Sequence, residues 1–336
     1  MSATDSLLKD IKNKNFLPIY FLAGEEPYYI DELTEALEKN VLTEDEKAFN
    51  QTIVYGQDVD MEQLISLAKQ YPMGAEKQLI IVKEAQHLAR EIDKLLPYAE
   101  NPQSSTVLVF NFKGKTIDKR LKIAKTLQKL NAYHEFKKIY ESKIPDWIDQ
   151  RVLKSGVKID MKAKMLLAEF VGANLSRLDN EIEKLALIIG KGNTITPDQI
   201  ERNIGISKDY NNFELRTAII NKDMPKIASI IHYFDKNPKE NPIIVTISAI
   251  FNLFQSLVIL HTLEDKSPSN AAKNLGVHPY FVNEYFTGAK NYPLKSTMQI
   301  ISLIREYDMK SKGVGATGNV SHADLLKELA IKIIHS

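Results

Sequence analysis

The 336-residue sequence contains no cysteine, and its other shortages also exclude whole classes of protein. Without cysteine there is no disulfide framework and no thiolate-bound metal, which fits a reducing compartment. The formal net charge is only +1, so no global field favours nucleic acid or a membrane surface. The N-terminal segment has no apolar run long enough for a secretion signal, so we expect a cytoplasmic protein.

Recognisable catalytic patterns are missing as well. None of the seven histidines stands at a metal-ligand spacing, and neither a nucleophile elbow nor a dinucleotide fingerprint occurs. We therefore predict no catalytic residue, no metal site and no cofactor. The most apolar segment, 242–263, carries polar side chains along its length, so we interpret it as a buried helix and predict no membrane span.

Short apolar runs alternate with helical patterns over residues 1–140. Each run has the length of a strand, and the runs at 79–82 and 106–110 have the apolar content of a buried one. The runs cover 17–22, 51–55, 79–82 and 106–110, with a possible edge strand at 132–136. This alternation predicts an α/β domain built on a parallel sheet.

After residue 140 the pattern becomes helical throughout. Helix caps and apolar spacing predict a small helical domain over 141–208 and a C-terminal helical bundle over 209–336, with a glycine-bearing loop at 314–320. Bundles of this kind often oligomerise through exposed apolar grooves. The predicted fold class is thus α/β plus all-α.

Gly24, Glu25, Glu26 and Pro27 lie between a strand and a helix, where a nucleotide-binding protein carries its phosphate loop. That loop needs a second glycine, a lysine and a hydroxyl residue, which together hold the phosphates and magnesium. All three are missing here. Two carboxylates repel phosphate and Pro27 lacks an N–H donor, so we predict that this loop does not bind nucleotide.

Tyr71, Pro72, Met73 and Gly74 form a short apolar segment, here called the tip, just before the strand at 79–82. Two interpretations are open. Met73 folds back and packs on the core, which the local pattern favours, or the tip is exposed and binds a protein.

Residues 113–143 carry ten cations and only three acids. One interpretation is contact with a DNA phosphate backbone, which needs cations but no base-reading side chains. The candidates for that contact are Lys119, Arg120 and Lys122. The alternative is a solvated helix face.

Four patches, in order along the chain, resemble the delta-subunit family of the bacterial DNA polymerase III clamp loader. They are residues 18–28, 72–79, 175–185 and 307–313. No patch is diagnostic alone, but their order and spacing make the resemblance fairly specific, and it covers essentially the full length.

The resemblance implies an AAA+-like first domain (1–140) that has lost ATP binding, a helical lid (141–208) and a C-terminal collar (209–336). The collar would assemble a five-subunit ring with the delta prime and tau/gamma subunits. It also implies that an exposed hydrophobic pair binds and opens the beta sliding clamp for loading onto primed DNA. That pair falls within the tip, at Pro72–Met73 or Met73–Gly74, with Tyr71 as a substitute for the second large side chain.

Together with the unusable phosphate loop, the resemblance favours the exposed interpretation of the tip. Such a subunit belongs to a DNA-directed DNA polymerase holoenzyme, a nucleotidyltransferase complex, but the sequence contains no polymerase site of its own. Two alternatives remain: a divergent AAA+ ATPase of DNA metabolism, and a helical adaptor whose α/β domain is inert.

Overall fold

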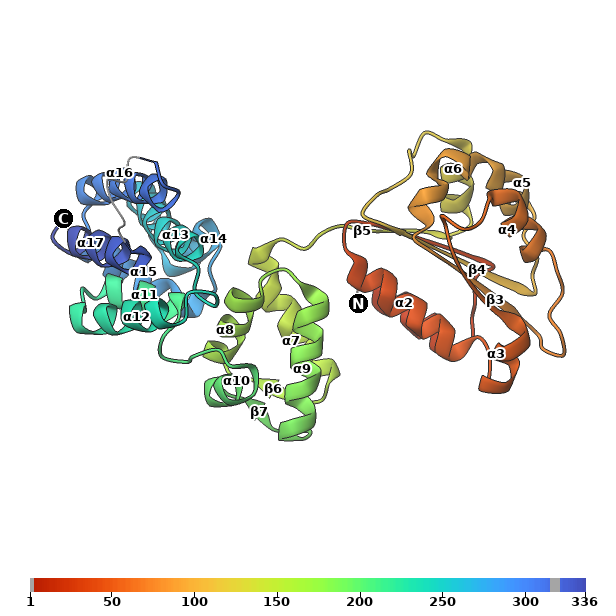
Figure 1. Ribbon diagram of the computed structural model, residues 1–336, viewed down its shortest axis with the longest axis horizontal. Helices are drawn as coiled ribbons and strands as arrows, with labels where there is room; N and C mark the ends of the chain where they lie inside the picture. Colours follow the sequence, from red (N-terminus) through yellow and green to blue (C-terminus); the bar gives the residue numbers. More distant parts are fainter. Residues whose placement is uncertain (1–2, 315–320) are drawn as a thin grey trace. The chain divides into compact units, whose positions relative to one another are not determined.

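The structure is a computed structural model that describes residues 3–314 and 321–336. The chain divides into two compact units, Met1–Ile139 and Tyr140–Ser336 (Figure 1). Apart from Val314, the predicted loop at 314–320 lies outside the described residues.

A five-stranded parallel sheet forms the centre of the first unit, in the order β2-β3-β4-β1-β5. The strands are β1 (Ile19–Gly24), β2 (Gln51–Tyr55), β3 (Gln78–Lys83), β4 (Thr106–Lys113) and β5 (Tyr133–Phe136). β1, β3 and β4 are buried over almost their whole length because both faces of the sheet are covered, which is why they appear in the sequence as continuous apolar runs.

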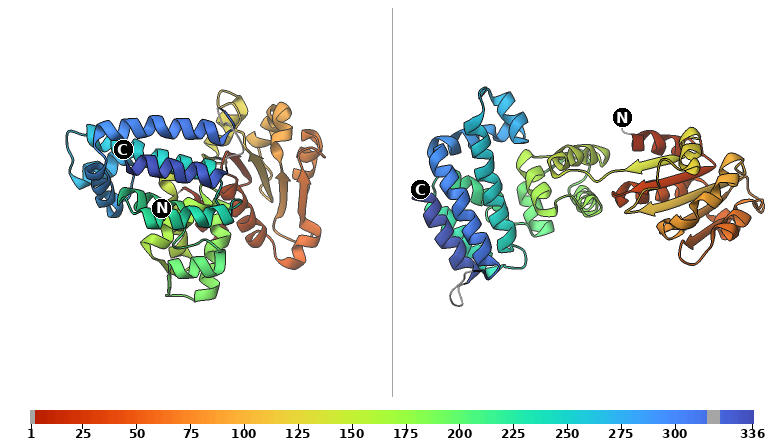
Figure 2. Two further views of the ribbon diagram at one scale, coloured as in Figure 1. Left: turned by 60° about the vertical axis from the view of Figure 1, so that its left-hand side comes forward. Right: turned by 90° about the horizontal axis from the view of Figure 1, so that it is seen from above.

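Helices cover the sheet on its two faces (Figure 2). They are α1 (Ala3–Lys12), α2 (Pro27–Asn40), α3 (Glu44–Asn50), α4 (Met61–Ala68), the 3₁₀-helix η1 (Ala85–Leu95), α5 (Leu96–Glu100) and α6 (Lys122–Lys129). Tyr20 and Leu22 of β1 pack in one apolar core with residues of α1 and α2, while Ile19 and Phe21 pack in a second core with residues of α4, η1, α5 and α6. The unit therefore has three layers, helix, sheet and helix.

Ile117 and Leu121 continue the helical spacing of Ala124 and Leu127, yet both precede the helix that contains those two residues. The helix α6 begins only at Lys122, and Leu121 has an extended backbone. The carboxylate of Asp118 accepts hydrogen bonds from both the backbone N–H and the guanidinium of Arg120, a local turn that competes with helix formation. Ile117 is still buried, but from the loop.

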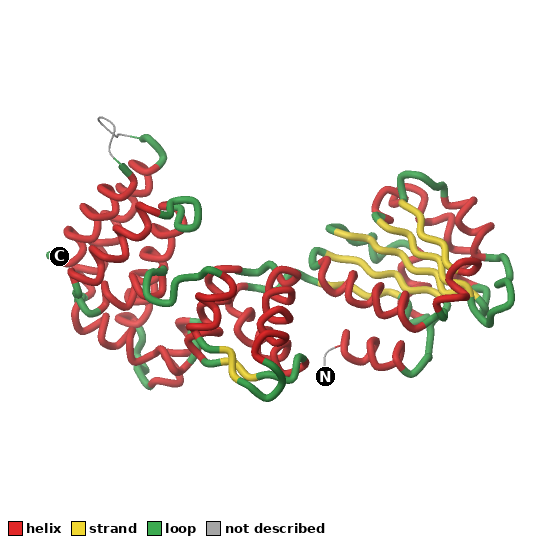
Figure 3. Tube along the Cα trace, turned by 60° about the horizontal axis from the view of Figure 1, so that its bottom comes forward, coloured by secondary structure: helices red, strands yellow, loops and turns green. Residues whose placement is uncertain are grey.

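The first part of the second unit is helical except for one small ladder. It contains η2 (Glu141–Lys143), α7 (Ile144–Lys154), α8 (Met161–Val171), α9 (Leu175–Ile189) and α10 (Pro197–Ile204). The prediction of helices alone after residue 140 was wrong, because β6 (Lys158–Ile159) and β7 (Thr194–Ile195) pair in parallel (Figure 3). Two residues per strand are too short to show a sequence period.

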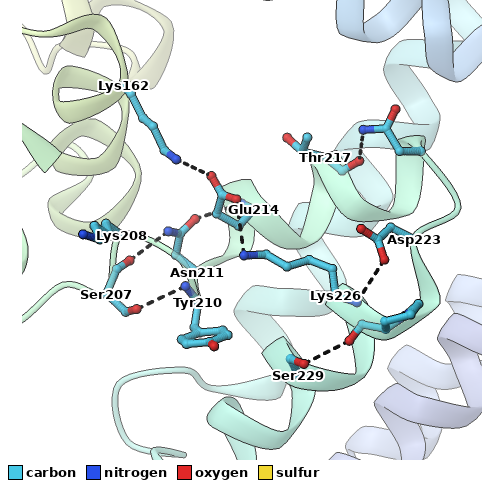
Figure 4. A network of polar contacts seen from close by, with 12 residues as sticks. Lys162, Ser207, Lys208, Tyr210, Asn211, Glu214, Thr217, Asp223, Lys226 and Ser229 are labelled. Atoms are coloured by element: carbon cyan, nitrogen blue, oxygen red, sulfur yellow. Dashed lines mark hydrogen bonds and ion pairs between the residues drawn. The ribbon is translucent and has the colours of Figure 1, made fainter.

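The rest of the second unit is a helical bundle. Its helices are α11 (Asn212–Ile220), α12 (Met224–Lys236), α13 (Ile243–Thr262), α14 (Pro268–Leu275), η3 (Pro279–Phe281), α15 (Val282–Asn291), α16 (Leu294–Ser311) and α17 (His322–Ile334). Figure 4 shows the start of α11, where Lys162 of α8 pairs with Glu214 at 2.7 Å. A second pair, Arg216 with Glu169 at 2.8 Å, also joins α11 to α8. The fold confirms the predicted combination of a parallel-sheet α/β part and an all-helical part, while the boundary between residues 208 and 209 stays a prediction.

Helix α13 is, among the described residues, the one helix long and apolar enough to cross a membrane by length and composition, with 44% of its most apolar window buried in the bundle. Its buried side chains, such as Ile250, Phe254 and Leu257, lie in the main core of the bundle. This packing supports the interpretation of a core helix.

Candidate functional site

The tip lies between α4 and β3, and its two large side chains point away from the core. Tyr71 is 79% exposed and Met73 is 68% exposed, whereas Pro72 is half-buried. Gly74 has a φ of +67°, a left-handed conformation that glycine adopts without strain. The interpretation in which Met73 folds back onto the core does not describe this structure.

The main chain of Met73 is held by one buried side chain, Asn50 at the end of α3. The Met73 N–H donates to Asn50 Oδ1 at 2.6 Å, and Asn50 Nδ2 donates to the Met73 carbonyl at 3.0 Å. Asn50 Nδ2 also donates to the Glu46 carbonyl at 3.1 Å. The side chain of residue 73 is therefore exposed while its backbone is fixed.

Gln78, the first residue of β3, holds the other side of the tip. Its Nε2 donates to the Gln70 carbonyl at 2.6 Å and to Thr106 Oγ1 at 2.8 Å. The Thr106 hydroxyl in turn donates to the Ala68 carbonyl at 2.8 Å, where α4 ends. Sequence reasoning missed Asn50 and Gln78, because a polar residue gives no sign in the sequence of a partner that lies far along the chain.

Where a phosphate loop would lie, Glu25 and Glu26 join β1 to α2, and the N–H groups of Gly24 and Glu26 are already bonded. The N–H of Gly24 donates to the Lys115 carbonyl at 3.0 Å, and that of Glu26 donates to the Phe136 carbonyl at 3.2 Å. Pro27 is the first residue of α2 and has no N–H, as predicted from its position. A phosphate would have to break these bonds to be bound.

The carboxylate of Glu26 takes the place of an anion at the N-terminus of α2. Its oxygen accepts a hydrogen bond from the Tyr28 N–H at 3.3 Å, and the side chain is buried. Burial raises the pKa of the Glu26 carboxyl, while the bond from Tyr28 and the charge of Lys138 lower it by less. An internal negative group at this point opposes the entry of a phosphate.

Each of the three cations predicted to contact DNA has an acidic partner. Lys119 pairs with Glu135 at 2.6 Å, Arg120 with Asp118 at 2.6 Å and Lys122 with Glu100 at 3.0 Å. All three cations remain exposed. Lys125 and Lys129 share a face of α6 with Lys122 and are also exposed.

Over residues 3–314 and 321–336, no group of three or more histidine, aspartate or glutamate side chains could hold a metal ion. The end of β3, where an ATPase carries acidic residues, is followed by Glu84 in a left-handed conformation with a φ of +49°. Its carboxylate lies 3.6 Å from His87, and both side chains are half exposed.

Two separate stretches of the chain match family models of the same protein subunit. Residues 20–137 match the model of the family described as DNA polymerase III, delta subunit. Residues 209–328 match the model described as DNA polymerase III delta subunit, C-terminal domain. The two matches together span more than half of the chain.

Two curated relatives carry the same description. The DNA polymerase III subunit delta of Bacillus subtilis (strain 168) is 26% identical over 316 residues, which are 90% of this chain and 90% of that protein. A probable DNA polymerase III subunit delta of Aquifex aeolicus (strain VF5) is 21% identical over 224 residues, 63% of this chain and 62% of that protein.

A solved structure, the Bacillus subtilis DNA clamp loader delta protein, shares the fold with a TM-score of 0.57 and 23% identity. The alignment covers 99% of this chain and 100% of that one. Both ends of the chain match models of one family, and the fold agrees over nearly its full length. The chain belongs to the DNA polymerase III delta subunit family.

Proposed function

We propose that this chain binds the ring-shaped beta sliding clamp through its tip and opens it for loading onto primed DNA during replication. The observation that carries the proposal is a pair of exposed apolar side chains, Tyr71 and Met73, on a backbone held by buried hydrogen bonds, in a member of the delta subunit family. A role in replication of a bacterial chromosome implies a cytoplasmic location, which we include in the proposal.

Opening the clamp in this way needs binding energy and no chemical step. A ligand that binds the open ring more tightly than the closed ring shifts the equilibrium by the difference in its two affinities. One apolar side chain buried at an interface typically contributes about 2 kcal/mol or more, which is roughly a thirtyfold bias. Contacts of Tyr71 and Met73 that form only with the open ring would therefore shift the equilibrium between closed and open clamp substantially toward the open form.

The proposal includes the absence of ATP binding and hydrolysis by this chain itself. The N–H groups of Gly24 and Glu26 are bonded to carbonyls, and the Glu26 carboxylate caps α2, which supports this part of the proposal. The alternative, a divergent AAA+ ATPase, requires measurable nucleotide affinity. We expect a calorimetric titration with Mg-ATP to give no binding heat, and saturable binding would favour the alternative.

Membership of the family implies a complex with other clamp-loader subunits, and we propose that the bundle provides this contact as a collar. Helix α13 contains no Asp, Glu, Lys or Arg over its 20 residues. It nevertheless exposes Ile244 (49%), Val245 (53%) and Phe251 (38%). An uncharged, partly apolar helix face of this kind fits the delta prime and tau/gamma subunits as partners.

We further propose that the basic segment contacts the DNA backbone once the complex has assembled. The pairs made by Lys119, Arg120 and Lys122 are exposed, and exposed ion pairs contribute only about 0–1 kcal/mol. A phosphate can therefore replace the carboxylate partner at little cost. Lys125 and Lys129 extend the positive surface along α6.

The direct test is binding of the purified chain to the clamp of the same organism. We expect a stable complex between the isolated chain and the clamp, and none with a clamp whose hydrophobic binding pocket is blocked by a competing peptide. Absence of any complex would favour the alternative of a helical adaptor with an inert α/β domain.

A further inference from the structure

We propose that Asn50 is a positioning residue for the tip: its buried carboxamide fixes the Met73 backbone so that the exposed side chain meets the clamp in one conformation. The inference rests on the proposed function, because it names what orients the same binding site. Asn50 lies 23 residues before Met73 in the sequence and is the last residue of α3.

The amide of Asn50 makes three of its four possible hydrogen bonds, and no other small side chain offers the same set of donors and acceptor. Its one oxygen accepts from the Met73 N–H, and its two N–H groups donate to the carbonyls of Met73 and Glu46. Turning the amide over would set donor against donor and acceptor against acceptor. An aspartate would place a negative oxygen against two carbonyls.

The position of Asn50 also connects the tip to the sheet. It is 4% exposed and stands between the last turn of α3 and the first residue of β2. On the opposite side of the tip, Gln78 bonds the Gln70 carbonyl from the start of β3. The chain is thus held at Met73 from the end of α3 and at Gln70 from the start of β3, while the side chains of Tyr71 and Met73 are exposed.

Without this contact, the tip would have to become ordered when it binds the clamp. Ordering the backbone of one residue on binding lowers the association constant about tenfold or somewhat more. We therefore expect Asn50→Ala to weaken clamp binding about tenfold while the apolar side chains stay in place. The loss should come from the free chain, whose tip is no longer ordered in advance.

A purely structural role for Asn50 is distinguished by combining Asn50→Ala with Met73→Ala in a double-mutant cycle of clamp affinity. If Asn50 acts through Met73, removing its side chain changes affinity about tenfold in the wild-type background and less than twofold in the Met73→Ala background. If it affects binding independently of Met73, the two losses add, and if it only stabilises the unit, Asn50→Ala keeps wild-type clamp affinity.

Hydrogen exchange at the Met73 amide gives a readout that does not depend on the clamp. This N–H is bonded to Asn50 in the free chain, so we expect it to exchange much faster in Asn50→Ala, while amides of β4 are unchanged. Asn50→Asp should keep the acceptor for this N–H but lose the two donors, and should bind the clamp no better than Asn50→Ala.

Asn111→Ala is the matched control, since Asn111 is a buried amide (2% exposed) that accepts from the Thr34 hydroxyl at 2.9 Å. It should destabilise the first unit without changing clamp affinity. Wild-type affinity of Asn50→Ala, or additive losses in the cycle, would overturn the positioning role. If Met73→Ala itself binds like wild type, the proposed site fails instead.

Discussion

Replacing both exposed side chains of the tip, in Tyr71→Ala/Met73→Ala, isolates their contribution to clamp binding. The bonds from Asn50 are made to main-chain atoms of residue 73, so the backbone of the tip is retained. Because the two side chains are 79% and 68% exposed, their removal leaves no core cavity. We expect the free energy of unfolding to change by no more than about 0.5 kcal/mol.

The size of the effect on binding follows from the exposed fractions. Burying a whole methionine side chain contributes about 1.5–3 kcal/mol, and roughly two thirds of that is available at Met73, or about 1–2 kcal/mol. Tyr71 offers a similar amount. The double variant should therefore bind the clamp about 30- to 1,000-fold more weakly, with the lower end expected if Tyr71 lies at the rim.

The assay is an equilibrium titration of the isolated chain against immobilised clamp. Tyr280→Ala/Met309→Ala removes the same two side-chain types from the second unit, where they are 67% and 40% exposed. This control should bind like wild type. The reasoning is refuted if the double variant at the tip keeps wild-type affinity with an unchanged circular dichroism spectrum, or if the control loses as much.

Three further predictions concern the rest of the first unit. Gly24→Ala should destabilise it by about 3 kcal/mol or more in urea unfolding, because a Cβ there would lie 2.0 Å from the Phe136 carbonyl oxygen and Gly24 has a φ of +132°. The pKa of the Glu26 carboxyl is raised in the folded state, so protonated Glu26 stabilises the fold at low pH, and this stabilisation is lost as the pH rises from the unfolded pKa through the raised folded pKa. Glu26→Gln should remove this pH dependence of the free energy of unfolding. A pH profile identical to that of the wild type would contradict the prediction. Neutralising Lys119, Arg120 and Lys122 together should make the plot of log affinity for DNA against log salt concentration less steep, by the equivalent of about two to three phosphate contacts, when measured on the assembled complex. An unchanged slope would eliminate the proposed DNA contact.

The strands and the helix starts could be predicted because each depends on residues adjacent in the sequence. The run at 79–82 lies inside β3, because strands covered on both faces of a parallel sheet need apolar residues on both sides. The run at 51–55 is β2 as predicted, but β2 is an edge strand whose residues are only partly buried or exposed. Pro27 begins α2 because a proline fits the first turn of a helix. The tip lies directly before β3, as expected from its place in the sequence, while its role in clamp binding stays a prediction.

The features that hold the tip could not be predicted, because they join residues that are distant in the sequence. The Asn50–Met73 contact spans 23 residues and the Gln78–Thr106 contact spans 28. Asparagine and glutamine are ordinary surface residues by composition, and only the fold shows that these two are buried. The partners of Lys119 and Lys122 were missed for the same reason.

If the chain opens a closed ring as proposed, the position of β3 in the sheet has a mechanical consequence. β3 begins four residues after the tip and is hydrogen-bonded on one side to β2 and on the other to β4. A force applied at Met73 along β3 would act in shear on the hydrogen bonds that join β3 to β2 and to β4, so that these bonds resist it together. An edge strand would instead peel away one bond at a time. The tip is thus attached to a stiff part of the molecule, and strain is passed to the clamp interface before the subunit deforms.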